Sequence, residues 1–133
     1  MRTIVKFDPI DVEALTEKQI AFMANSLKSE VKKIISDAKT NVQNLGYMKT
    51  GSLMKAITSK VKHKGNKLYA IVGIDNRYVT YDENGNKIRP SKYSIFLEFG
   101  TKHMKPSFFL TKAGNTNISH IMATLKKSAE EGL

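Results

Sequence analysis

The segment TEKQIAFMANSLKSEVKKIISDAKTNVQNL, residues 16–45, decides the fold because its apolar residues recur every three or four positions. This spacing places them in one stripe along a helix, and the stripe must be buried against the rest of the chain. Thr16 and Gln19 have the spacing of a capping box, and Leu15 and Ile20 have that of a hydrophobic staple. The segment therefore predicts a long helix that starts near Thr16.

A β-hairpin is predicted after Gly46, a residue type that commonly ends a helix. A β-rich segment starts near Ile57, and KLYAIVGI at residues 67–74 follows the turn signal at residues 64–66. Two antiparallel strands joined by this turn fit the pattern best.

A second hairpin is predicted between RYVTY and NKIRP, because Asn84 and Gly85 both tolerate the positive φ values of a tight turn. Pro90 makes its second arm an edge or an exit from the sheet. Residues 93–99 satisfy neither the strand period nor the helical period fully, and we favour a short helix there.

The C-terminal part is predicted to be a loop followed by a helix from about Asn117. Lys126 and Lys127 would lie in its last turns and complement the helix dipole. Phe108 and Phe109, in the loop, are expected to return apolar area to the sheet or to an adjacent subunit.

These elements predict an α+β fold in one domain, residues 1–133, with the two terminal helices packed on a small antiparallel sheet that carries an extended hairpin. A hydrophobic content of 41% suffices for a modest core. The sequence has no cysteine, so disulfides and thiolate metal sites are excluded. No apolar run approaches the length of a signal or a membrane span, and we expect a protein that is cytosolic when made.

The chain is strongly basic, with 22 Lys and Arg residues against 12 Asp and Glu and a formal charge of +10. Such a charge attracts nucleic acid, anionic surfaces or an acidic protein. The lysines are scattered along the whole chain, which favours a solvated surface over a dedicated nucleic-acid face. There is no helix-turn-helix, zinc-finger or aromatic RNA-binding signature, so only non-specific attraction to phosphate is predicted.

Metal sites and cofactors are not predicted. His63, His103 and His120 are far apart, and none has a second ligand at a metal-binding spacing. The acidic string around Asp82 lacks the glycine and glutamate positions of a calcium loop and is better explained by a hairpin turn. Around Gly100 the spacing of a phosphate-binding loop is missing.

Glu98 is the one acidic residue that stands out, because it lies between Leu97 and Phe99 in an apolar run. A buried carboxylate needs a partner such as Lys, Arg or a backbone donor. No second acid accompanies it, so a structural salt bridge or an intersubunit contact is strongly favoured over catalysis. We therefore predict no catalytic residues and no enzyme activity.

Three segments, KTGSLMKAI (residues 49–57), YSIFLEFGT (93–101) and KPSFFL (105–110), together carry a resemblance. In their order and spacing they resemble the lambdoid gene-product-ten family of head-to-tail joining, or tail-completion, proteins of long-tailed bacteriophages. In the third segment one extra residue, Ser107, separates Pro106 from Phe108 when compared with the family's pattern. The matching positions are Thr50, Gly51, Leu53 and Ile57 in the first segment, Tyr93, Glu98, Phe99, Gly100 and Thr101 in the second, and Pro106, Phe108 and Leu110 in the third.

The resemblance implies a non-enzymatic virion protein that forms a ring of six subunits between the connector and the tail terminator. It would occupy the host cytoplasm during assembly and then the head–tail junction, without a membrane. The hairpins and the arm at residues 78–90 are candidate subunit contacts, and a basic inner wall near Lys62 and Lys102 would touch DNA non-specifically. The alternative is a small basic nucleic-acid-binding accessory protein.

The motif residues also have mechanical interpretations. Gly51 is expected to permit a bend out of the long helix, with Thr50 or Ser52 bonding free backbone groups. Leu53 would then dock on the core. Gly100 is expected to take a conformation closed to other residues and to direct the loop after it towards a partner.

Overall fold

The predicted long helix is α1, Glu17–Leu45, in the computed structural model, which describes residues 2–6, 9–45 and 50–131. Its capping box is confirmed: the Thr16 N–H donates to Gln19 Oε1 at 2.9 Å, and the Gln19 N–H donates to Thr16 Oγ1 at 3.1 Å. Two otherwise unpaired backbone donors are thereby satisfied at the helix start. Gly46, the expected stop, lies outside the described residues.

The apolar stripe of α1 is buried as predicted. It packs against the sheet on one side and against the last helix on the other. Because the stripe runs along six turns, it aligns the whole body along one axis. The fully buried apolar residues of α1 are Met23, Leu27, Val31, Ile34, Ala38 and Val42.

The first predicted hairpin is confirmed as β3, Ile57–Lys64, and β4, Lys67–Ile74, paired antiparallel over their whole length. The turn between them uses Gly65 at a φ of 59°, a conformation that glycine adopts without strain. Alternate residues of β4 point into the core, and the fully buried ones are Leu68, Ala70, Val72 and Ile74.

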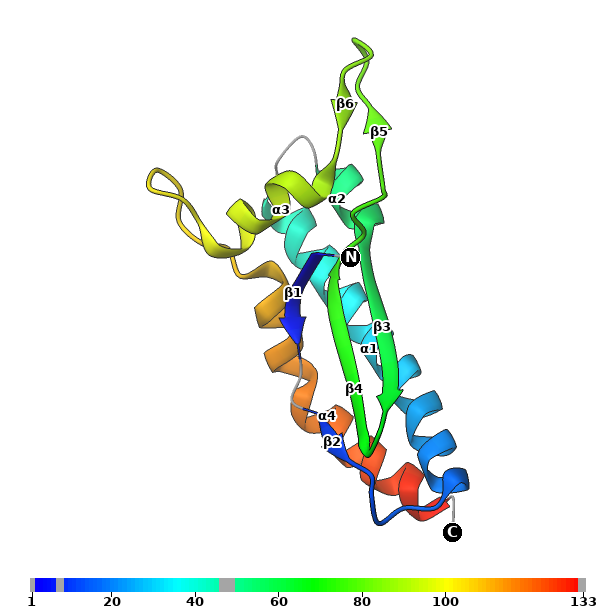
Figure 1. The fold of residues 1–133 in the computed structure, drawn as a ribbon. Helices are drawn as coiled ribbons and strands as arrows, with labels where there is room; N and C mark the ends of the chain where they lie inside the picture. Colours follow the sequence, from blue (N-terminus) through cyan, green and yellow to red (C-terminus); the bar gives the residue numbers. More distant parts are fainter. Residues whose placement is uncertain (1, 7–8, 46–49, 132–133) are drawn as a thin grey trace.

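The sheet is three strands wide because two short strands share the second edge of β4. β1, Arg2–Lys6, pairs with the end of β4, and β2, Ile10–Asp11, pairs with its start. In Figure 1 the strands lie in front of the two long helices, which cover one face of the sheet. The other face of the sheet is left open to solvent.

The last helix, α4, Phe109–Glu131, runs antiparallel to α1. Gln19 Nε2 donates to the Ala129 carbonyl at 3.1 Å near one end of the pair, and Asn41 Nδ2 donates to the Phe109 carbonyl at 2.9 Å near the other. Polar contacts at both ends fix the register in which the apolar faces meet.

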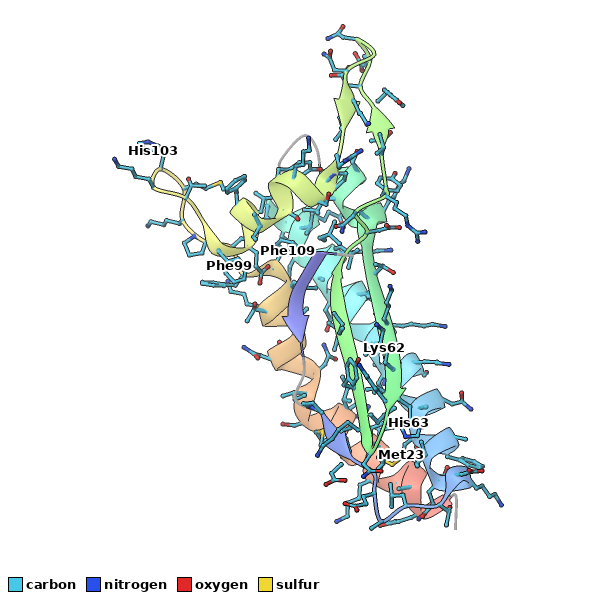
Figure 2. The ribbon with its side chains drawn as sticks, in the orientation of Figure 1. Met23, Lys62, His63, Phe99, His103 and Phe109 are labelled. Atoms are coloured by element: carbon cyan, nitrogen blue, oxygen red, sulfur yellow. The ribbon has the colours of Figure 1, made fainter. Side chains whose placement is uncertain are left out.

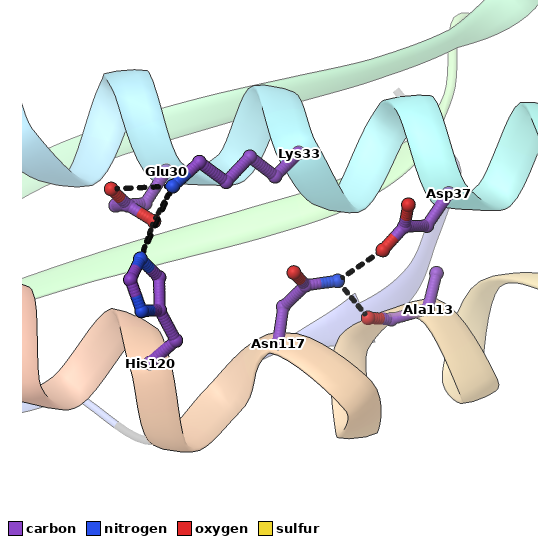
Figure 3. Close-up of polar contacts among 6 residues, drawn as sticks. All are labelled: Glu30, Lys33, Asp37, Ala113, Asn117 and His120. Atoms are coloured by element: carbon purple, nitrogen blue, oxygen red, sulfur yellow. Dashed lines mark hydrogen bonds and ion pairs between the residues drawn. The ribbon is translucent and has the colours of Figure 1, made fainter.

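Between these ends, further polar contacts join α1 to α4, some of which Figure 3 shows. The buried carboxylate of Glu30 lies 3.1 Å from Lys33 Nζ and 3.5 Å from Nε2 of His120 on α4. About two turns further along α1, Asn117 Nδ2 donates to Asp37 Oδ2 at 2.7 Å. The sequence does not predict the contacts of His120, because Glu30 and Lys33 precede it by 90 and 87 positions.

Two short helices close one end of the body. α2, Thr50–Ala56, contacts α3, Pro90–Phe99, and both lie beside the ends of β3 and β4. The short helix favoured for residues 93–99 is confirmed, and it begins earlier, with Pro90 in its first turn. The bend predicted at Gly51 is wrong, because Gly51 lies inside α2 and has no positive φ.

The second predicted hairpin projects from this same end as β5, Thr80–Tyr81, and β6, Lys87–Ile88. Gly85 has a φ of 81°, but the positive φ expected at Asn84 is wrong, since Phe108 is the only non-glycine residue with a positive φ in the described part of the chain. The turn is wider than expected and is organised by Asp82 Oδ1, which accepts the N–H groups of Asn84 and Asn86.

The expected start of the C-terminal helix is wrong. α4 begins at Phe109 and not near Asn117, because its first turn is capped from another part of the chain, as described below. Lys126 and Lys127 lie in the last two turns of α4, as predicted, although the final turn itself holds no basic residue.

The predicted fold class is confirmed: α1 and α4 pack together and on a small antiparallel sheet in an α+β arrangement. Among the described residues, no helix has the length and apolar character needed to span a membrane.

Thr16→Ala tests the capping box. Loss of the hydroxyl acceptor leaves the Gln19 N–H without its partner, and we expect the free energy of unfolding to fall by about 1 kcal/mol. Urea denaturation followed by circular dichroism measures it. The matched control is Thr40→Ala in the same helix, whose hydroxyl only bonds back to the Ser36 carbonyl. Equal effects of the two substitutions would show that the box contributes nothing.

Candidate interaction site at the α3–α4 junction

The carboxylate of Glu98 is fully buried and caps the start of α4. Glu98 Oε2 accepts the Leu110 N–H at 2.9 Å, and Oε1 accepts the Thr111 N–H at 2.9 Å and the Thr111 hydroxyl at 2.5 Å. These N–H groups belong to the first turn of α4, where the helix has no internal acceptor for them. The negative charge also lies at the positive end of the helix dipole.

This contact decides between the partners considered for Glu98. Backbone donors, one of the predicted alternatives, are confirmed, and a salt bridge is not formed. Among the described residues, Lys33, Lys67, Arg77 and His120 form the ion pairs, and none of them is near Glu98 in the chain. Glu98 can cap α4 because Phe108, which directly precedes the helix, has no side-chain acceptor of its own.

Gly100 ends α3 and turns the chain into the loop of residues 101–107. Its φ is 77° and its ψ is 177°, a region that only glycine occupies without strain. A Cβ atom there would lie 2.7 Å from the Met104 carbonyl oxygen and 2.7 Å from the Pro106 nitrogen. Both the predicted special conformation and the need for glycine are therefore confirmed.

The loop after Gly100 projects from the body, and His103 lies at its tip in Figure 2. Thr101 and Met104 exchange backbone hydrogen bonds of 2.9 and 3.3 Å, which narrows the loop into a short finger. At its base the Ser107 N–H donates to the Leu97 carbonyl at 2.9 Å. The finger is thus fixed at its root and exposed at its tip, where Lys102 and His103 are solvent-exposed.

Three phenylalanines lie exposed around this junction. Phe96 and Phe99 are each 51% exposed and Phe108 is 37% exposed. The rings of Phe99 and Phe108 meet edge to face with centroids 6.4 Å apart. Phe109, by contrast, is buried in the body, as one of the two expected alternatives has it (Figure 2). For the exposed Phe108 the other alternative, contact with an adjacent subunit, stays a prediction.

Phe108 holds its exposed position through a strained backbone. Its φ is 50°, which is rare for a residue with a large side chain. The Phe108 N–H donates to the Glu98 carbonyl at 3.0 Å, and its own carbonyl accepts the first hydrogen bond of α4 from Lys112 at 2.8 Å. Backbone hydrogen bonds on both sides of Phe108 thus accompany the strained conformation, next to the carboxylate contacts of Glu98.

The three sequence segments that carry the family resemblance come together at this end of the molecule. Leu53 in α2 and Ile57 at the start of β3 are buried in the core, as predicted, and α2 lies against α3. Leu110 in α4 is fully buried below them. Nothing is described for the side chain of Thr50. Segments far apart in the sequence thus build one structural unit.

Tyr93 of α3 is half-buried within this unit. Burial raises the pKa of the Tyr93 phenol to about 12, and the neighbouring Tyr78 phenol adds to the rise. The hydroxyl of Tyr93 therefore stays protonated throughout the physiological pH range.

A basic pocket lies at the base of the β5–β6 hairpin and was not predicted. It has a volume of about 260 Å³ and is lined by Lys87 of β6, Arg89 before α3, and Lys92 in the first turn of α3. The sequence KIRPSK does contain these cations, but only the change from β6 to α3 at Pro90 gathers them around one hollow.

A second basic surface lies on the open face of the sheet. The strand register pairs Lys60 with Ile71, Lys62 with Tyr69 and Lys64 with Lys67, and paired residues share one face. All four lysines are exposed. The face therefore combines a row of positive charge with a half-buried tyrosine, and Lys62 marks it in Figure 2.

The remaining candidates for chemistry are structural. His63 and His103 are exposed, and His120 pairs with Glu30. Across residues 2–6, 9–45 and 50–131, no group of three His, Cys, Asp or Glu side chains is placed to hold a metal ion. Asp82 organises a hairpin turn, as predicted in place of a calcium loop.

Comparison with known proteins adds no further assignment. No family model, no curated protein and no solved structure matches the chain.

Glu98→Gln tests the cap on α4. The amide nitrogen of glutamine would face N–H donors that now meet a carboxylate oxygen, and we expect the free energy of unfolding to fall by about 2–3 kcal/mol. Chemical denaturation measures it. The control Glu83→Gln, on an exposed residue of the β5–β6 turn, should leave the midpoint unchanged. A Glu98→Gln protein as stable as the parent would show that the Glu98 carboxylate does not stabilise the start of α4.

Gly100→Ala and Gly51→Ala form a matched pair that separates backbone strain from helix propensity. Alanine at position 100 meets two backbone atoms and a glycine-only conformation, so we expect a loss of about 2 kcal/mol or more. Alanine at position 51 meets nothing within 4 Å and should leave stability unchanged or slightly raised. Thermal unfolding compares them, and the reverse order of stability would refute the assignment of Gly100.

Proposed function

We propose that the chain is a non-enzymatic structural protein that assembles into a ring at the head–tail junction of a long-tailed bacteriophage. The proposal starts from the three segments that resemble the tail-completion family. It is supported by their convergence around α2, α3 and the start of α4, since a family motif spread over the sequence is expected to serve one place in the fold.

The observation that carries the proposal is the exposed pair of Phe99 and Phe108. Holding a phenylalanine at a φ of 50° costs on the order of 1–3 kcal/mol. In the isolated chain this strain leaves two apolar rings partly in water, where they contribute little. A neighbouring subunit that covers both rings would offset the strain, because burial of their apolar area is favourable.

A closed ring needs two different surfaces on each subunit, one complementary to the other. The junction with its finger supplies the first. The β5–β6 hairpin supplies the second: it projects from the same end of the body, and its Tyr81 is 65% exposed. Each hairpin would reach the junction of the next subunit and place an aromatic residue against the exposed phenylalanines.

The remaining parts of the proposal follow from the resemblance. The ring has six subunits and joins the connector to the tail terminator, after assembly in the host cytoplasm. The lysine row on the open face of the sheet is the candidate inner wall, where weak contacts to phosphate would let DNA pass.

A second candidate function is non-specific nucleic-acid binding by a small accessory protein. The same lysine row favours it, because Lys60, Lys62, Lys64 and Lys67 surround Tyr69 on one face. The two candidates differ in affinity: an accessory protein should be retained on DNA in moderate salt with a steep salt dependence, whereas a channel wall should not.

Deletion of the gene from a phage genome that carries it tests the first candidate. We expect DNA-filled heads and finished tails that remain separate, and infectious particles should form when the purified protein is added. Electron microscopy and plaque counts measure both. Normal virions without the gene, together with tight DNA binding by the purified chain, would decide for the accessory protein.

Phe108→Gly sharpens this test. Glycine relieves the positive φ, which offsets part of the stability lost with the ring, so the variant should still fold. We expect it to restore far fewer infectious particles than the parent protein does. The control Phe22→Ala removes an exposed phenylalanine from α1 and should restore them fully. Full activity of Phe108→Gly would show that the exposed aromatic pair is not needed for assembly.

A further inference from the structure

The basic pocket at the base of the β5–β6 hairpin is unusual because its cations form no ion pair among the residues that the structure describes. Lys87, Arg89 and Lys92 line it, and none of them takes part in an ion pair within the described part of the chain. The first turn of α3 contains no acidic residue either. Three positive charges therefore converge on one hollow without a carboxylate to neutralise them.

Arg89 gives the second observation. Its Nε atom is buried, yet it has no hydrogen-bond partner among the residues that the structure describes. An unpaired buried donor is unfavourable, and more so when the group is charged. Arg89 also occupies the position before the first turn of α3 without forming a side-chain cap. The guanidinium thus has donor capacity that the fold leaves unused.

We propose that Lys87, Arg89 and Lys92 form a phosphate-binding pocket. A guanidinium presents a planar fork of donors that matches the oxygens of phosphate, and two lysines add point charges beside it. The positive end of the α3 dipole adds to the same field. Phosphate fits better than a carboxylate, because its additional oxygens can satisfy donors from three side chains at once.

The phosphate has two possible sources, free phosphate and the backbone of a nucleic acid, and both present the same group to the pocket. The pocket is separate from the exposed phenylalanines and from the lysine row on the sheet. The inference therefore holds whether or not the chain forms a ring.

Nuclear magnetic resonance tests the pocket through the Nε–H signal of Arg89 and the backbone amide of Lys92. Inorganic phosphate is titrated into the full chain, with sodium chloride at matched ionic strength as the reference. We expect a saturable shift of both signals with phosphate and none with chloride. Arg89→Gln should weaken the affinity by about tenfold, read from the Lys92 amide.

The matched control is Lys102→Gln, which removes one charge from the finger and should leave the titration unchanged. A short single-stranded DNA that displaces phosphate identifies the nucleic-acid backbone as the source, and one that leaves the pocket signals unmoved identifies free phosphate. A shift that does not saturate, persists in Arg89→Gln, or is matched by acetate would overturn the proposal.

Discussion

The buried carboxylate of Glu98 is the contact on which the α3–α4 end of this protein depends. Helix α4 has no capping side chain at its own start, and Glu98 supplies one from the last turn of α3. This bond holds α3 and α4 at a fixed angle and determines where the finger of residues 101–107 leaves the body. A separate backbone contact lies beside it: the Glu98 carbonyl accepts the N–H of Phe108, the residue whose positive φ leaves its ring exposed.

The rest of the fold provides a rigid support for that junction. Contacts from Gln19 to Ala129 at one end and from Asn41 to Phe109 at the other fix α4 along α1, so the start of α4 cannot shift without breaking them. Two projecting segments, the finger and the β5–β6 hairpin, leave the same end of this body. An elongated support with projections at one end suits a subunit that contacts its copies side by side.

Local signals explain what the sequence could predict. The start of α1 depends on Thr16 and Gln19, only three positions apart, and the β3–β4 hairpin depends on a turn at Gly65, so both were recognisable. The start of α4 was misplaced because its cap comes from Glu98, more than ten positions earlier, and no local pattern reports it. The basic pocket was missed because Lys87, Arg89 and Lys92, although close in the sequence, line one hollow only through the way β6 passes into α3.

Amide hydrogen exchange in the native state tests the role of Glu98 most directly, because the bonds in question involve the N–H groups of Leu110 and Thr111. First-turn amides of a helix normally exchange quickly, since nothing within the helix accepts them. The account predicts that both amides are protected nearly as well as that of Ile34 in the core of α1. Exchange as fast as that of Lys102 in the exposed finger would contradict it.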